Sequence, residues 1–166
     1  MTREHTCGFA ALVLGTTLSV VACTSIDCPV QNTVSCIYKV MSTDGSDGML
    51  EDTLNVFTIR IDGTDSLLLN RCVNTKTFSL PISYTNAEDT LVFKMNNRGW
   101  MTIDTVYVSK ENHPQFESVD CQLAFFHTIT AVRWTTEYID SIAIIKPSVN
   151  YDTSTPHLHI YFKTRP

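Results

Sequence analysis

The sequence predicts an all-β domain in which two antiparallel sheets pack into a β-sandwich, of the immunoglobulin-like or a related Greek-key kind. Short runs that alternate apolar with polar residues, or that are rich in β-branched residues, recur at a spacing of about 8–12 residues. Turn-forming residues separate these runs, and no window of a dozen residues shows an apolar stripe with the 3.6-residue period of a helix. A small closed β-barrel is the alternative arrangement of the same strands.

The expected strands follow one another along most of the chain. In the second run, Val56 and Thr58 fall on one face of the strand and Phe57 and Ile59 on the other, because side chains alternate with a period of two. The runs cover residues 34–41, 53–61, 66–69, 77–82, 90–95, 101–108, 121–126, 129–134, 139–145 and 158–162.

Turn residues explain where the strands stop. Asp62-Gly63 lies between two apolar runs and predicts a tight hairpin, since glycine tolerates a positive φ. Residues 96–99, Asn-Asn-Arg-Gly, predict a second hairpin. Residues 44–48 and 150–156 are expected to be longer surface loops, and a short helical turn is an alternative at residues 135–137.

The N-terminal stretch differs in composition from the rest of the chain. The 15 residues Gly8–Ala22 include no charged side chain. A helix of this length rises only about 22 Å, which is less than the ~30 Å hydrocarbon core of a bilayer. We therefore interpret residues 1–22 as a secretory signal peptide rather than as a membrane span.

The end of this stretch has the pattern of a bacterial lipobox. Val20-Val21-Ala22-Cys23 places an aliphatic residue and two small or modest residues before a cysteine. The signal peptidase needs small side chains beside the cleaved bond, and the thiol receives the diacylglycerol. We expect Cys23 to become the new amino terminus and to hold two or three fatty acyl chains, such as palmitate, which suffice for stable membrane anchoring.

The predicted organisation is a signal peptide, a short tether and one folded domain. Residues 23–33 form the lipidated N-terminus and tether, and residues 34–166 form a single β-sandwich domain. The five steps from Cys23 to Cys28 span at most ~18 Å, so the domain is expected close to the bilayer. This predicts a lipid-anchored protein of the cell envelope, at the outer membrane, and leaves open whether it faces the periplasm or the surface.

The cysteines fit an oxidising compartment. Of the 6 cysteines, one leaves with the signal peptide and Cys23 takes the lipid. Four others outside the cytoplasm predict disulfides with three connectivities, and reduced buried thiols are the alternative. No Cys-x-x-Cys pair and no close Cys/His spacing suggests a zinc site. We favour the pairs Cys28–Cys121 and Cys36–Cys72.

Charge and motifs exclude several classes of function. The net charge is −5 at pH 7 and there is no basic cluster, which argues against nucleic acid as a partner. The sequence has no G-x-S-x-G, H-E-x-x-H, S-x-x-K or phosphate-binding glycine loop. We therefore expect no enzyme and no cofactor, and a hydrolase with an unrecognised site ranks third among the functions considered.

Several segments resemble a family of small uncharacterised lipoproteins of Bacteroidota. The resemblance covers most of the mature chain and implies origin and location, because no activity is established for the family. It provides no catalytic residues. The segments that resemble the family are residues 23–29, 78–82, 116–121, 125–128, 139–142, 149–152 and 157–162.

Two histidines on the last strand are the weak candidates for metal binding. His157 and His159 are two residues apart, so both imidazoles are expected on one face of the strand. Zinc or copper would need a third ligand, which His127 or His113 could supply. The preferred interpretation is a polar outer face of the strand with no metal.

Aromatic residues near strand ends are the best sequence indication of a binding surface. Trp100 and Trp134 are the weak candidates, because aromatic rings at a sandwich rim stack on sugars or anchor protein partners. The alternative is that these rings cover the core.

Together these features predict a lipid-anchored, non-enzymatic accessory or interaction module of the envelope. Its partners are membrane lipid, through the acyl anchor, and an envelope protein. A surface glycan-binding lipoprotein is the alternative function.

Overall fold

The computed structural model describes residues 34–59, 63–97, 99–116, 118–119 and 121–164. The predicted signal peptide 1–22 and tether 23–33 lie outside the described residues. The described residues form β1 (Ser35–Met41), β2 (Thr53–Ile59), β3 (Asp65–Cys72), β4 (Thr77–Pro81), β5 (Glu88–Asn97), β6 (Trp100–Gln115), β7 (Ala124–Trp134), β8 (Ile139–Ile144), β9 (Ser148–Val149) and β10 (Leu158–Phe162).

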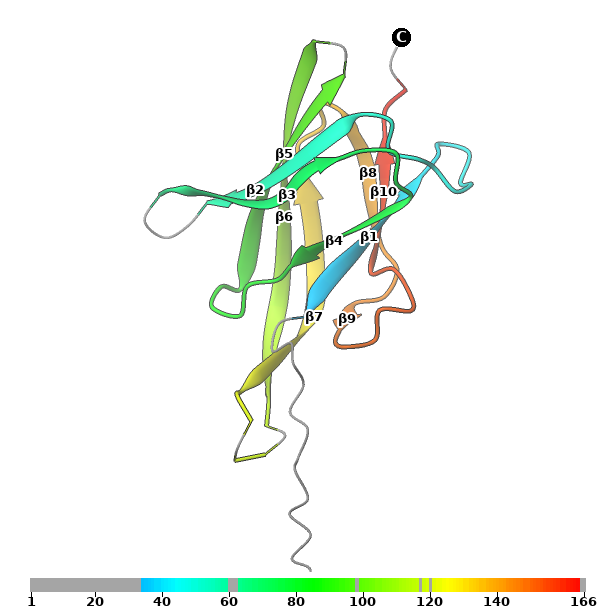
Figure 1. Cartoon of the computed structure of the whole chain (residues 1–166). Helices are drawn as coiled ribbons and strands as arrows, with labels where there is room; N and C mark the ends of the chain where they lie inside the picture. The colour runs from blue at the N-terminus through cyan, green and yellow to red at the C-terminus, as the bar shows by residue number, and fades with distance from the viewer. Residues whose placement is uncertain (1–33, 60–62, 98, 117, 120, 165–166) are drawn as a thin grey trace, which may run out of the picture.

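The strands form two sheets, which confirms the predicted all-β sandwich (Figure 1). The smaller sheet has the strand order β4-β1-β10-β8 and the larger has the order β3-β2-β5-β6-β7-β9. Both sheets have open edges and neither closes on itself, so the barrel alternative is wrong.

One strand pair departs from the antiparallel rule. β1 and β10 are parallel, with Tyr38 opposite Leu158 and Val40 opposite Ile160. A parallel pair needs a long connection between its strands, and here that connection is most of the domain. The small sheet is therefore mixed, with the first and last strands side by side at its centre.

The core lies between the sheets and contains an aromatic cluster. Tyr38 on β1 stacks on Phe78 of β4 at 5.0 Å, and both rings contact Phe93 of β5 in the opposite sheet, at 6.1 and 6.2 Å. Their exposed fractions are 6% or less. Because aromatic pairs bury large areas, these three rings join the two sheets at their middle.

The predicted strands agree with the observed ones at most positions. The runs 121–126 and 129–134 belong to one strand, β7, because the chain stays extended through His127 and Thr128, which pair with β6 and β9. β6 continues to Gln115, past the predicted end at 108. β9 was not predicted, since two residues give no detectable alternation.

The turn between β5 and β6 follows the sequence expectation. β5 and β6 form a hairpin in which Asn97 pairs with Trp100, and Gly99 has a φ of 90°. β2 and β3 are antiparallel neighbours and Gly63 has a φ of 79°, although Asp62 lies outside the described residues. The alternative helical turn at residues 135–137 is absent.

Candidate functional site

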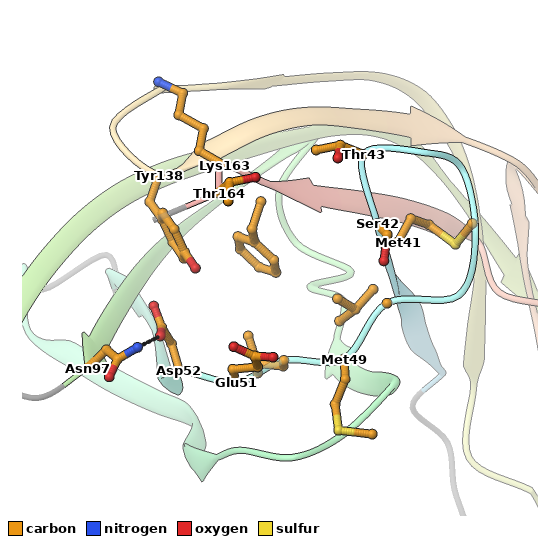
Figure 2. A pocket seen from close by; sticks show the side chains of 14 residues that line it. Met41, Ser42, Thr43, Met49, Glu51, Asp52, Asn97, Tyr138, Lys163 and Thr164 are labelled. Carbon is orange, nitrogen blue, oxygen red and sulfur yellow. Dashed lines mark hydrogen bonds between the residues drawn. The ribbon is translucent and has the colours of Figure 1, made fainter. Parts of the chain in front are cut away.

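A cavity of about 330 Å³ opens at one end of the sandwich, where several strand ends meet (Figure 2). Its volume is within the range of small-molecule sites. It is bounded by the end of β1, the β1–β2 loop, the end of β5, the residue before β8 and the residues that follow β10. A larger hollow of about 510 Å³ lies over β1 and β4, but no charged side chain lines it.

The polar part of the cavity is a carboxylate–amide pair. Asp52 precedes β2 and is only 2% exposed. The Nδ2 atom of Asn97, the last residue of β5, donates a hydrogen bond to Oδ1 of Asp52 at 2.5 Å. The register explains the pairing, because Thr53 lies opposite Asn96 and the next pair along the two strands is Asp52 with Asn97. The neighbouring Glu51 is exposed on the rim of the cavity.

An aromatic pair forms the opposite side of the cavity. The rings of Tyr138 and Phe162 stack at 5.3 Å with an angle of 24° between their planes. The backbone N–H of Lys163 donates to the carbonyl of Tyr138 at 2.9 Å, and its Nζ donates to the carbonyl of Thr136. Figure 2 shows Tyr138 and Asp52 at the same opening, so one ligand could contact both.

Asp104 on β6 fixes the loop that positions Tyr138. Its carboxylate is fully buried and accepts four hydrogen bonds, at 2.7–2.8 Å. One donor is the hydroxyl of Thr135, and the others are the backbone N–H groups of Glu137, Tyr138 and Ile139. This bonding leaves no helical turn at residues 135–137, since the N–H of Thr135 donates to the carbonyl of Thr105 and that of Glu137 to the carboxylate.

The arrangement can hold a polar ligand that also has an apolar face. The Asp52–Asn97 pair provides hydrogen-bonding groups, while Tyr138 and Phe162 offer a ring surface. Sugars and extended peptides both combine hydroxyl or amide groups with apolar edges. The carboxylates of Glu51 and Asp52 belong to the lining, whereas the ammonium group of Lys163 points away from the cavity towards the carbonyl of Thr136 (Figure 2). The cavity therefore favours neutral or cationic ligands.

Residues 53–162 match a protein family whose description is "Family of unknown function (DUF6452)". The chain belongs to this family. No curated protein matches the chain, and no solved structure matches it. The DUF6452 match begins at β2, so β1 lies outside it although β1 pairs with both β4 and β10 at the centre of the small sheet. Within the described part of this DUF6452 chain, no helix is long and apolar enough to cross a membrane.

The structure separates the two tryptophans that the sequence suggested. Trp100, at the start of β6, is 74% exposed and lies opposite Asn97, but it does not line the cavity. Trp134 packs against the core, and its Nε1 donates to the carbonyl of Asp140 at 3.3 Å. Only Trp100 therefore presents its ring to solvent near the cavity.

The expected common outer face of His157 and His159 is wrong for His157. His157 is fully buried just before β10, and its Nδ1 accepts a hydrogen bond from the backbone N–H of Ile37 at 2.9 Å. That bond occupies the lone pair of Nδ1, so the ring completes the β1–β10 pairing. His159 is half-buried, in register with Lys39 of β1.

The proposed third metal ligands are not near these histidines in the strand order. His113 and His127 lie on β6 and β7 of the larger sheet, where they bond Thr128 at 3.0 Å and Asn112 at 2.7 Å. Among the residues that the structure describes, no group of three His, Cys, Asp or Glu side chains could hold a metal ion.

The predicted Cys36–Cys72 disulfide is wrong, because both thiols are free. Cys36 lies on an inner strand of the small sheet and Cys72 on an edge strand of the large sheet. Packed sheets lie ~10 Å apart, whereas a disulfide needs Cα atoms within ~7 Å. Burial raises the pKa of the Cys36 thiol, which keeps it protonated. Cys121 is disulfide-bonded, but Cys28 lies outside the described residues, so the Cys28–Cys121 pair stays a prediction.

The sequence analysis gives no role to Asp52 and places Asn97 only in a hairpin turn, whereas Tyr138 is one of the aromatic residues near a strand end. Only the register between β2 and β5 brings the side chains of Asp52 and Asn97 together. A carboxylate directly before one strand and an amide at the end of the neighbouring strand are the sequence signal that could have found the pair.

Removing the Asp104 carboxylate is predicted to destabilise the domain strongly. The substitution Asp104→Ala leaves three backbone N–H groups without their acceptor, and we expect a loss of about 3–5 kcal/mol in the free energy of unfolding. Asp140→Ala, at an exposed carboxylate, should change it by about 0.5 kcal/mol or less. Urea unfolding followed by circular dichroism measures both, and equal midpoints for the two variants would refute the role of Asp104.

The domain is predicted to lose stability in mild acid through His127. Burial, with Lys110 and His113 nearby, lowers the pKa of His127 from 6.5 to about 4. The unfolded chain then binds more protons below pH 6.5, so the stabilisation is complete above pH 6.5 and is lost as the pH falls towards 4.

Between pH 7 and pH 5 the His127 contribution should amount to about 2 kcal/mol. Urea midpoints measured across this range should fall less steeply for His127→Gln than for the wild type. His113→Gln, at a histidine whose side chain is 47% exposed, removes the last of the three causes that lower the pKa of His127 and should reduce the slope less than His127→Gln does. An unchanged slope in His127→Gln would contradict the assignment.

Proposed function

We propose that this DUF6452 chain is a lipid-anchored protein of the bacterial cell envelope that acts, without catalysis of its own, as an interaction module. Cys23, in the lipobox pattern Val20–Cys23, is the proposed acylation site. The resemblance to small Bacteroidota lipoproteins supports the same assignment and favours the outer membrane.

The observation that carries the proposal is the position of the cavity relative to the start of the domain. β1 begins at Ser35, and its other end, Val40–Met41, lines the cavity. Seven strand residues span about 23 Å. From Cys23 to Val34 there are 11 steps, at most ~40 Å of extended chain. A domain tethered through its N-terminus would thus direct the cavity away from the membrane, where a partner could reach it.

A second candidate function, glycan binding, is favoured by the chemistry of the cavity. The Asp52–Asn97 pair faces the same opening as the Tyr138–Phe162 rings. Carboxylate and amide groups bond sugar hydroxyls, and aromatic rings stack on the apolar face of a pyranose. The exposed Trp100 lies in register with Asn97 and could extend such a surface.

Acylation is predicted to depend on Cys23 alone. In cells that process lipoproteins, Cys23→Ser should abolish incorporation of labelled fatty acid and move the protein into the aqueous phase of a detergent separation. Cys72→Ser, which replaces a free thiol, should leave both readouts unchanged. A wild-type protein that keeps residues 1–22, or that already partitions into the aqueous phase, would refute the anchor.

The interaction surface is predicted to lie at the cavity. A photo-crosslinking residue at Met49, which is 51% exposed on the cavity rim, should give one dominant adduct with an envelope protein in living cells. The same residue at Leu67, which is 47% exposed on β3, should not. Equal adducts from both positions would argue against a specific surface.

A glycan array distinguishes the second candidate. Binding that is lost in Asn97→Ala and kept in Asn96→Ala, its exposed neighbour on β5, would support a sugar site in the cavity. Binding that survives both substitutions would exclude the cavity as that site.

A further inference from the structure

The end of the sandwich opposite the cavity exposes large apolar side chains on one turn. β6 starts at the cavity end with Trp100 and runs the length of the domain to Gln115, so the turn between β6 and β7 projects from the far end (Figure 1). On this turn Phe116 is 71% exposed, Val119 is 85% exposed and Leu123 is 49% exposed. Exposed apolar residues gathered in this way mark a contact surface.

Ring stacking, hydrogen bonds and a buried ion pair fix the residues beside this turn. The ring of Tyr84 stacks on that of Phe125 at 4.9 Å, and Asn112 donates to the carbonyl of Tyr84 at 3.1 Å. A buried ion pair between Lys110 and Asp89, at 2.9 Å, fixes the loop that contains Tyr84, because Asp89 also accepts from the backbone of Ser83 at 3.1 Å. The aromatic surface next to the turn is therefore built on a rigid base.

The start of β1 lies towards this same end, since Ser35 pairs with Pro81, which comes shortly before the loop that contains Tyr84 (Figure 1). In the sequence, the segment from Cys23 joins β1 at that start. The turn also includes Cys121, which is disulfide-bonded. If its partner is Cys28, as the sequence predicts, the disulfide links the turn to a residue five positions after the acylated Cys23. The turn is then at most ~18 Å of extended chain from the lipid. A bilayer is then the nearest apolar phase to these side chains.

We propose that the β6–β7 turn is a second membrane contact, in which Phe116, Val119 and Leu123 rest in the interfacial layer of the bilayer that holds the acyl chains of Cys23. This inference rests on the proposed lipid anchor. The sequence of the turn also includes Glu117 and Asp120, whose charges oppose entry into the hydrocarbon. Contact at the boundary between headgroups and acyl chains, ~5–10 Å deep, is the depth that apolar side chains beside charged ones reach.

An environment-sensitive fluorophore tests the contact in the complete acylated protein. It is attached to Val119→Cys or, as a control at the cavity end, to Met101→Cys, which replaces a side chain that is 65% exposed. Both variants are made in a Cys72→Ser background, and Cys36 is shielded in the core. The proteins are reconstituted into vesicles of phosphatidylethanolamine and phosphatidylcholine, with or without brominated acyl chains.

We expect the emission at position 119 to shift to shorter wavelength and to be quenched by the brominated lipid, while the emission at position 101 changes in neither respect. Equal behaviour at the two positions would overturn the membrane contact. A blue shift at 119 in native membranes but not in the vesicles would also overturn it, in favour of a protein partner at the turn.

Partitioning of the same preparations in detergent separates the two proposals. An acylated protein without quenching at position 119 refutes the second contact and leaves the anchor intact. A protein that partitions into the aqueous phase refutes both. With Phe116→Ser added, quenching at position 119 should weaken, whereas Ile103→Ser, an exposed residue near the other end of β6, should have no effect.

Discussion

The hydrogen bonds of one buried carboxylate, that of Asp104, fix the connection through which the chain passes from the large sheet to the small one. Residues 135–138 connect β7, in the large sheet, to β8, in the small one. Asp104 lies on β6 of the large sheet and accepts the N–H groups at the end of this connection. A buried carboxylate is costly unless it is fully hydrogen-bonded, and here four donors satisfy it. The crossing between the sheets, the position of Tyr138 and the shape of the cavity all follow from this bonding.

The two ends of the sandwich differ in chemistry. The cavity end combines the Asp52–Asn97 pair with a stacked aromatic pair, whereas the other end exposes apolar side chains on the β6–β7 turn. The outer face of the large sheet is different again, since Lys94 lies 4.3 Å from the ring centre of Phe57 and Arg133 lies 3.7 Å from that of Tyr107. These cations cover aromatic rings that would otherwise meet water. Exposed apolar side chains, such as Trp100 and Met101, also occur at the cavity end, so the buried Asp52–Asn97 pair is what distinguishes that end.

The sequence predicted the parts of this structure that depend on local pattern. Period-two alternation located β2 and β5, and glycine at positive φ located the β5–β6 hairpin. The parallel pairing of β1 with β10 has no local signal, because it joins residues about 120 positions apart, as with Ile37 and His157. The burial of His157 and the separation of Cys36 from Cys72 depend on that pairing and on the sheet order, and both were predicted wrongly for this reason. The cavity could not be found for the same reason, since it forms where the ends of distant strands meet.

The central position of β1 has a consequence for how the molecule reaches its native state. Its two neighbours are β4, which follows after β2 and β3, and β10, the last strand of the described domain. Until residues 158–162 are available, one edge of β1 has no partner, and β8 cannot join the small sheet through β10. Contacts of such long range are made late and slowly. A chain of this topology therefore completes its small sheet only after all the strands of the large sheet have been made.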